Sequence, residues 1–403
     1  MRSSSSDRND NNNDTPKFTA SQLKEVARLC GKNRSGTKAV ITSRITDDLQ
    51  EFRPLAPGTR VLSIDLGIRN LAYSLLEVPG NRHEISTNQT AEGGGGQRRT
   101  RKSKKESDLA SSVSVTPILR AWERLALIPK TPKPIKAKAK GKTTKNKTKK
   151  DASAEHEVLG KLDPDTAGTT TITTTTAAEN DAVVAAADSA TTTVSIEDFS
   201  PLRLSQLAAD LILTRLLTLR PDIITLEQQR FRSMGGSAVF EWTLRVNSLE
   251  SMLYAVFTTL EKLGKWPGGR LEGVVARNVL EFMAVQEGGA EAASIWNKKG
   301  SMDNKKIKKD IVGRMLLAGE GVVINEEKQD EGAGGQVEAV AREYLDKWQA
   351  KGRKAKSGAE GLKKLDDLAD CLLQGLAFIR WQENKRRLLD GGVEALQDQM
   401  VDE

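Results

Sequence analysis

The chain has 403 residues, of which 62 are Lys or Arg and 54 are Asp or Glu, so its net charge is +8, and 37% of its residues are hydrophobic. This balance excludes a wholly disordered chain, and at about 150 residues per domain the length predicts two or three domains. No segment approaches the roughly 20 apolar residues of a membrane helix, and the first residues lack the apolar run of a secretory signal, so we expect a soluble protein.

The N-terminal region predicts a disordered tail and then a helical hairpin. Residues 1–16 are polar, whereas residues 19–49 carry apolar side chains at helical spacing on both sides of a turn at residues 31–36. These apolar residues are Leu23, Val26, Ala27, Leu29 and Cys30 in the first helix and Ala39, Val40, Ile41 and Ile45 in the second. We therefore expect a hairpin within residues 17–52, which either binds a partner or is a small packing module.

Three strand candidates open the main domain, which we assign to residues 57–128 and 198–395. Residues 60–65 form an apolar run that ends in a carboxylate, and residues 70–78 form a second run. Because so few residues separate the two runs, they predict a hairpin that turns at residues 67–69. A third strand is expected within residues 118–128.

Two segments lack the apolar residues that a folded core needs, and we expect both to be disordered insertions. The first covers about residues 88–112, and the second, residues 129–197, is Lys-rich and then Thr/Ala-rich. Lys fills 10 of the 21 positions from 130 to 150. This run is either a solubilising linker or a nonspecific phosphate-binding arm, and the sequence leaves both open.

The second half of the chain alternates helices and strands. Residues 221–227 predict a buried strand that again ends in a carboxylate, and residues 273–279 predict a fifth strand. Helices are expected at residues 202–219, 240–263, 303–317 and 362–389, with a loop at about 326–336. The pattern is that of an α/β fold, a mixed five-stranded sheet flanked by helices.

The helix expected at residues 240–263 carries a heptad-like apolar seam. The seam consists of Trp242, Val246, Leu249, Leu253, Val256 and Leu260, with further apolar residues beside it. A helix buried within one subunit and a contact between two subunits explain this pattern equally well.

Carboxylates are the side chains most suited to chemistry in this sequence. The two cysteines, Cys30 and Cys371, and the two histidines, His83 and His156, are too few and too scattered for a zinc site or a histidine-based triad. Such cysteine usage fits a reducing, intracellular compartment. Asp65 and Glu227 each end an apolar strand candidate, where side chains reach a sheet face near its edge.

A further group of acids precedes an apolar helix near the C-terminus. Helical residues three or four apart share a face, so either Asp366 or Asp367 could pair with Asp370. If that helix begins near Asp65 and Glu227, four carboxylates converge, and a divalent cation would remove their repulsion. Hard oxygen ligands favour Mg²⁺ or Mn²⁺ over zinc. Each acid alone also has an ordinary explanation, as a turn residue or as a dipole partner in a helix's first turn.

Three motifs carry a resemblance to a known family. They are VLSIDLGIRNLAY at residues 61–73, ITLEQQRFRS at residues 224–233 and KKLDDLADCLLQ at residues 363–374. In order and spacing they resemble the fungal mitochondrial Holliday-junction resolvases, cruciform-cutting endonucleases related to bacterial RuvC. Residues 21–45, with RSGTK at 34–38, also resemble the SAP-type helical hairpin of that family, which binds DNA.

The resemblance implies a ribonuclease H-like fold, a homodimer and cleavage of four-way DNA junctions by two Mg²⁺ or Mn²⁺ ions, about 3.5–4 Å apart. At the matching positions Asp65, Glu227 and Asp370 would be catalytic metal ligands, joined by Asp367 or Asp366. Paired nicks suit a symmetric dimer, which makes residues 240–263 the candidate interface. The residues implied to contact DNA are Gln228, Gln229, Arg230, Arg232, Lys363, Lys364, Arg34 and Lys38.

Mitochondrial location is implied by the resemblance alone. The first 16 residues contain Asp7, Asp10 and Asp14, whereas mitochondrial presequences are amphipathic, Arg-rich and poor in acids.

Two other functions compete with a resolvase. An actin-like or sugar-kinase-like ATPase would begin with a strand ending in Asp-x-Gly, as at residues 65–67, but it needs a second such motif after an apolar strand, and Asp330-Glu-Gly332 lies in a polar segment. The second is a catalytically inactive junction-binding scaffold, which the full set of carboxylates disfavours. The GKTT at residues 141–144 is no P-loop, because Lys136 stands where its first glycine belongs.

Overall fold

The computed structural model describes residues 18–80, 115–128, 198–229, 240–298, 301–324, 334–350 and 364–400. The fold given below is that of the described residues outside 129–198. The tail at residues 1–16 and the insertions expected at 88–112 and 129–197 lie outside the described residues, so their disorder stays a prediction.

A mixed sheet with the strand order β5-β4-β1-β2-β3-β6 forms the centre of the fold. The strands are β1 (Arg60–Asp65), β2 (Leu71–Glu77), β3 (Ile118–Leu125), β4 (Ile223–Glu227), β5 (Arg270–Val274) and β6 (Val323–Ile324). β2 runs antiparallel to β1 and β3, whereas β1, β4 and β5 pair in parallel. The first five strands thus have the ribonuclease H-like order, which confirms the predicted α/β class.

Two details of the predicted sheet were wrong. The sheet has six strands among the described residues instead of five, because β6 has only two residues and is too short to give a sequence pattern. The fifth strand is Arg270–Val274, not residues 273–279, because the chain already enters a helix at Ala276.

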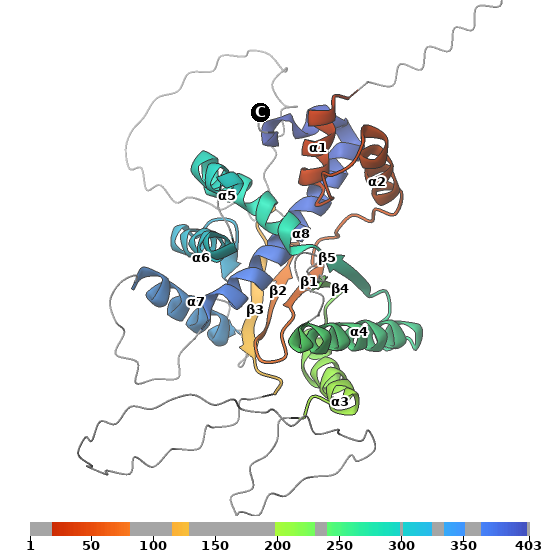
Figure 1. The fold of residues 1–403 in the computed structure, drawn as a ribbon, viewed down its shortest axis with the longest axis vertical. Helices are drawn as coiled ribbons and strands as arrows, with labels where there is room; N and C mark the ends of the chain where they lie inside the picture. Colours follow the sequence, from red (N-terminus) through yellow and green to blue (C-terminus); the bar gives the residue numbers. More distant parts are fainter. Residues whose placement is uncertain are drawn as a thin grey trace, which may run out of the picture. The chain divides into compact units, whose positions relative to one another are not determined.

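Helices cover both faces of the sheet (Figure 1). They are α1 (Ala20–Leu29), α2 (Lys38–Gln50), α3 (Pro201–Leu211), α4 (Glu241–Lys262), α5 (Ala276–Lys298), α6 (Ser301–Ala318), α7 (Gly334–Gln349) and α8 (Leu365–Gly391). Short turns η1 (Ile212–Leu216) and η2 (Leu217–Leu219) continue α3, and η3 (Val393–Gln399) follows α8. The predicted helices are present, whereas the sequence analysis did not identify α5 and α7.

Alternation along the strands separates two apolar cores. Leu62 and Ile64 of β1 face α3 and α4, whereas Val61 faces the side that carries α5 to α8. Because side chains alternate along a strand, Ser63 and Asp65 share the face of Val61. The C-terminal end of β1 therefore presents Asp65 to the face that α8 crosses (Figure 1).

Small side chains let α8 lie close against the sheet. A Cβ atom at Gly375 would come within 2.8 Å of Leu76 and 3.1 Å of Ser63. Two side chains of the sheet also form hydrogen bonds with backbone carbonyls of the helix. Ser74 Oγ of β2 donates to the Cys371 carbonyl at 3.0 Å, and Trp122 Nε1 of β3 donates to the Leu368 carbonyl at 3.0 Å. These contacts fix where the first turn of α8 begins.

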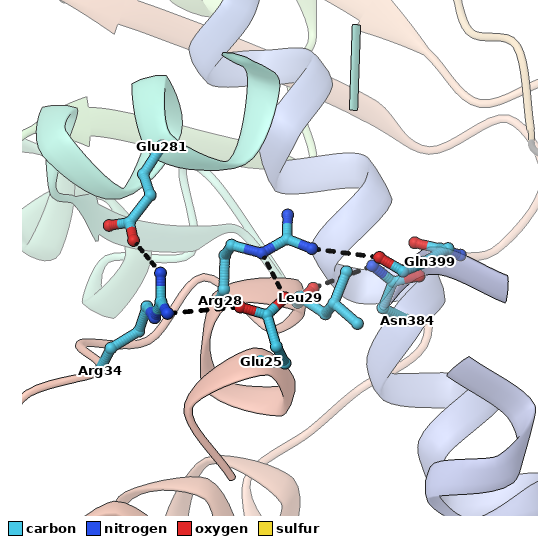
Figure 2. A network of polar contacts seen from close by, with 7 residues as sticks. All are labelled: Glu25, Arg28, Leu29, Arg34, Glu281, Asn384 and Gln399. Atoms are coloured by element: carbon cyan, nitrogen blue, oxygen red, sulfur yellow. Dashed lines mark hydrogen bonds and ion pairs between the residues drawn. The ribbon is translucent and has the colours of Figure 1, made fainter. Parts of the chain in front are cut away.

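The N-terminal helices form the expected hairpin, and α1 packs against the main domain. α1 starts with a capping box between Thr19 and Gln22. A polar network, which we call the hairpin junction, joins α1 to α5, α8 and η3 (Figure 2). It consists of Glu25, Arg28, Leu29, Arg34, Glu281, Asn384 and Gln399.

The seam on α4 is mostly buried within this chain. Leu249 and Leu253 are fully buried in the core between α3, α4 and the sheet, so they are unable to contact a second copy. The apolar surface near the start of α4 comes instead from Phe240 and Leu244, which are exposed, and from Trp242, whose ring packs on Phe199. Within the described residues, the structure contains no helix long and apolar enough to cross a membrane.

Candidate active site

The pairing of β1 with β4 brings two predicted acids side by side. The strands run in parallel with Val61 opposite Ile223 and Ile64 opposite Leu226. Continuing this register by one residue sets Asp65 opposite Glu227, on the same face. The two carboxyl groups lie within hydrogen-bonding reach of each other.

The first turn of α8 adds further acids above these strand ends. Gln374 fixes the helix at this point, because its Nε2 donates to the Thr225 carbonyl at 3.1 Å and to the Ile64 carbonyl at 3.3 Å. Asp370 lies one helical turn before Gln374 and lines a small cavity together with Glu227. Asp65, Glu227 and Asp370 therefore lie near one another, and their role as catalytic metal ligands stays a prediction.

The electrostatics of the site reflect this crowding. Burial raises the pKa of Asp65 well above its usual range, and the charge and hydrogen bond of Glu227, followed by the charges of Asp370 and Asp367, raise it further. Burial likewise raises the pKa of Asp370 to about 6, with Glu227 and Asp366 acting in the same direction against the lowering effect of Lys308. Repulsion of this kind is what a bound cation would remove.

Each of the three aspartates at the start of α8 has a cationic partner. Lys308 Nζ lies 2.7 Å from Asp370 Oδ1, Lys305 Nζ lies 2.8 Å from Asp366 Oδ2, and Arg124 Nε lies 3.0 Å from Asp367 Oδ2. By contrast, no Lys or Arg among the described residues forms an ion pair with Asp65 or Glu227. The two acids at the strand ends therefore have no cationic partner among the described residues, whereas the three acids at the start of α8 each have one.

The donor set suits a hard divalent cation, although the side chains are not gathered into a finished metal site. Nowhere in the described part of the chain are three or more His, Cys, Asp or Glu side chains arranged to hold a metal ion. The ion pairs of Asp366, Asp367 and Asp370 give a physical reason, because they direct these carboxylates toward Lys and Arg. The half-buried pair of Asp65 and Glu227, with Asp370 beside it, fits Mg²⁺ or Mn²⁺ in charge and ligand type.

The sequence alone left open whether Asp366 or Asp367 joins Asp370. The charge of Asp367 acts on Asp65, whereas Asp366 faces Lys305, a residue with a largely exposed side chain. The hydrogen bond from Lys305 lowers the pKa of Asp366, although burial opposes it. These contacts favour Asp367, and the assignment remains a prediction.

Several residues of the site escaped the sequence analysis. Lys308 and Arg124 were not singled out, since their approach depends on how α6 and β3 pack. Glu250 of α4 was missed as well: it accepts a hydrogen bond from the Gln229 backbone, and burial, together with the charge of Glu227, raises its pKa. A heptad pattern gives no sign that one position on a helix faces an acidic site.

The residues predicted to contact DNA differ in their surroundings. Gln228, Lys364 and Lys38 are exposed, and Gln229 is half-buried. Arg34 instead forms ion pairs with Glu25 at 3.4 Å and Glu281 at 2.5 Å, so it stabilises the hairpin junction in this structure. Arg230, Arg232 and Lys363 lie outside the described residues.

The strand order and the acids at the ends of β1 and β4 define a ribonuclease H-like α/β protein. Within that class, the chain belongs to the family described as mitochondrial resolvase Ydc2 / RNA splicing MRS1, which matches residues 61–388. This range contains all five acids of the candidate site.

Two individual proteins are similar to this chain. The mitochondrial cruciform cutting endonuclease 1 of Schizosaccharomyces pombe is 30% identical over 186 residues, which cover 46% of this chain and 60% of that relative. The chain thus spans less than two thirds of the relative's length. The crystal structure of the yeast mitochondrial Holliday junction resolvase Ydc2 aligns over 94% of this chain and 99% of its own, with 22% identity and a TM-score of 0.46.

Proposed function

We propose that this protein is a mitochondrial endonuclease that resolves four-way DNA (Holliday) junctions by paired, symmetric nicks. One observation carries the proposal: acids from two adjacent strands and one helix, far apart in the sequence, converge in a chain of the resolvase family. A mitochondrial location is supported by the names of the family and of the fission-yeast relative.

Asp65, Glu227, Asp370 and one of Asp366 and Asp367 would hold two Mg²⁺ or Mn²⁺ ions. When bound, such ions activate water and stabilise the leaving oxygen in phosphodiester hydrolysis. The chain's own contribution is to fix the oxygens in advance: strand pairing sets Asp65 beside Glu227, and Gln374 holds the helix that carries Asp370. The close packing of α8 on the sheet keeps bulk water away from the buried side of the site.

Basic and amide side chains near the acids would position the DNA. Gln228 and Gln229 follow Glu227 directly, with Arg230 and Arg232 next in the chain, and Lys363 and Lys364 precede the acids of α8. In the SAP-like hairpin at residues 17–52, the exposed Lys38 is a better phosphate contact than the ion-paired Arg34. Lys and Arg contacts of this kind supply affinity rather than sequence preference.

A homodimer would present two such sites to the two strands that must be cut. Phe240 and Leu244, together with the partly exposed Trp242, form an apolar surface at the start of α4 that is available to a second copy. Charged replacements there, rather than at the buried Leu249, test this interface. We expect Phe240→Glu with Leu244→Glu to give monomers in sedimentation experiments, with the fold preserved.

The decisive experiment compares substrates with and without Mg²⁺. Purified protein is incubated with mobile and fixed four-way junctions, linear duplex, and an RNA–DNA hybrid. We expect metal-dependent nicks only in the junctions, at symmetric positions. Equal cutting of linear duplex would indicate a general nuclease of the same fold, and ATP hydrolysis without DNA would revive the ATPase alternative.

A role in RNA splicing is the second candidate, because the family description joins resolvases with an RNA splicing protein. A scaffold for RNA or for junctions would bind without cutting and would not need metal. Tight junction binding with no nicking under any metal condition would therefore support this role over the nuclease. The carboxylate pair of Asp65 and Glu227 favours the nuclease, since a scaffold has no use for two adjacent acids that lack a cationic partner.

A further inference from the structure

Lys308 of α6 lines the same small cavity as Glu227 and Asp370 of the candidate site. Its ammonium contacts Asp370 at 2.7 Å, and only 17% of its side chain is exposed. Lys305, one turn earlier on α6, pairs with Asp366, and 64% of its side chain is exposed. Lys305 therefore lies at the surface, whereas Lys308 reaches inward.

The cavity that Lys308 reaches is the one between the acids. Glu227, Asp370 and Lys308 line it together, and its free volume is about 10 Å³. That volume is at the lower limit for a single water molecule, so a divalent ion that keeps bound water needs the space beside Asp370 that the Lys308 ammonium borders. Lys308 and a divalent cation would thus occupy the same place.

The arrangement of the acids explains why a cation suits this place. Asp65 and Glu227 lie side by side at the ends of two paired strands, and Asp370 lines the same small cavity as Glu227, so a positive charge between them reduces their mutual repulsion. An ammonium on a flexible four-carbon chain can supply one positive charge and can also move away. It cannot act as a metal ligand while it is protonated.

We propose that Lys308 is a placeholder cation, whose ammonium occupies the position of a divalent ion beside Asp370 and Glu227 in the metal-free protein and is displaced when the ion binds. The inference rests on the metal site of the proposed function. It explains why the described acids form no finished metal site: Lys308 directs Asp370 toward itself. It also implies that Lys308 lowers the affinity of the free protein for metal.

The test measures Mn²⁺ binding to the full-length protein without DNA, by isothermal titration calorimetry. Lys308→Met keeps most of the aliphatic side chain but removes the competing charge, and it should bind Mn²⁺ roughly tenfold more tightly, a change of about 1.4 kcal/mol. Lys305→Met is the matched control on the same helix, and its affinity should stay within about twofold of wild type. Lys308→Arg, which keeps a cation, should resemble wild type.

Thermal unfolding in EDTA provides the second readout. Without metal, Lys308→Met should melt below wild type, because its carboxylates lose their counter-charge, and Mn²⁺ should restore more of its stability than it adds to wild type. Should Lys308→Met fail to fold, Lys308→Gln serves with the same expectations. Equal or weaker Mn²⁺ binding by the variant would overturn the placeholder role alone. If neither wild type nor variant binds Mn²⁺, the proposed metal site fails together with it.

Discussion

The hairpin junction and the candidate active site both contain buried charges, but they balance them differently. At the junction Glu25 pairs with Arg28 at 2.9 Å and with Arg34, which also pairs with Glu281 (Figure 2). At the candidate active site Asp65 and Glu227 lie side by side, and the negative charge of Glu227 raises the pKa of Asp65. We call the junction a matched set, because its acids are paired with arginines, and Asp65 with Glu227 an unmatched set, because neither has a cationic partner among the described residues. A matched set stabilises packing, whereas an unmatched set indicates a site for a cation.

The sharpest way to test the comparison is to neutralise an acid of the unmatched set. Asp65→Asn should reduce junction cutting by about 10³-fold or more, since metal-based stabilisation of the reaction amounts to several kcal/mol. Junction binding in Ca²⁺ should change little, because the phosphate contacts remain. Cleavage assays on a fixed junction and gel-shift titrations measure the two effects. Glu338→Gln, on the exposed side of α7, is the control, and a normal cutting rate in Asp65→Asn would refute the metal assignment.

Breaking the matched set should instead affect the fold. Glu25→Ala leaves Arg28 buried without its carboxylate, and loss of one partner of a buried pair costs about 3–5 kcal/mol in the free energy of unfolding. Urea unfolding measures the change. Arg342→Ala breaks an exposed pair with Glu338 on α7 and should stay within about 1 kcal/mol of wild type. Equal effects of the two variants would show that the junction adds no more than a surface pair.

A third experiment decides which aspartate of α8 joins Asp65 and Glu227 in the candidate metal site. We expect Asp367→Asn to reduce the cutting rate by about 100-fold, and Asp366→Asn by less than about tenfold, because Asp367 acts on Asp65 whereas Asp366 pairs with Lys305. Both variants carry the same chemical change one residue apart, so each controls for the other. The reverse order would assign the ligand to Asp366.

The pH dependence of stability should also reveal the crowding of Asp65 and Asp370. The pKa of Asp370 is about 6 in the folded protein against an ordinary value of 3.8, and that of Asp65 is raised too, so the folded state holds more protons than the unfolded state in this range. The metal-free protein should therefore lose stability as the pH rises from about 4 to 6 and beyond. Urea unfolding in EDTA across this range measures it.

The same reasoning applies to variants at neutral pH. In EDTA at pH 7, Asp65→Asn should melt a few degrees above wild type, and saturating Mg²⁺ should reduce or reverse the difference. A variant that melts below wild type in EDTA would contradict the idea that the acids are unmatched.

The smallest expected effect concerns the exposed surface of the hairpin. Lys38→Ala should weaken junction binding by about two- to threefold, with a shallower salt dependence and unchanged thermal stability. Arg34→Ala should lower stability instead, because its partners are Glu25 and Glu281. Binding measured at several salt concentrations separates the two. A stability loss in Lys38→Ala would mean that this residue, too, supports the hairpin.

The sequence predicted those parts of the molecule that depend on local pattern. Asp65 and Glu227 could be recognised because each ends an apolar strand, and neighbouring parallel strands end at the same edge. Gln374 and Lys308 could not be recognised, since one bonds to backbone carbonyls of two strands and the other comes from a helix whose packing is not encoded locally. Arg34 was interpreted as a phosphate contact for the same reason: the two carboxylates that bind it lie 9 and 247 positions away along the chain.

The hydrogen bonds of Gln374 set the rotational phase of α8. Its amide spans the carbonyls of Ile64 and Thr225, so the helix can neither roll nor slide without losing them. One residue inserted between Asp370 and Gln374 would turn the acids by about 100° away from the strands. The spacing of four residues between Asp370 and Gln374 is therefore fixed by the fold. Insertions or deletions between these two residues should be far less tolerated than substitutions there.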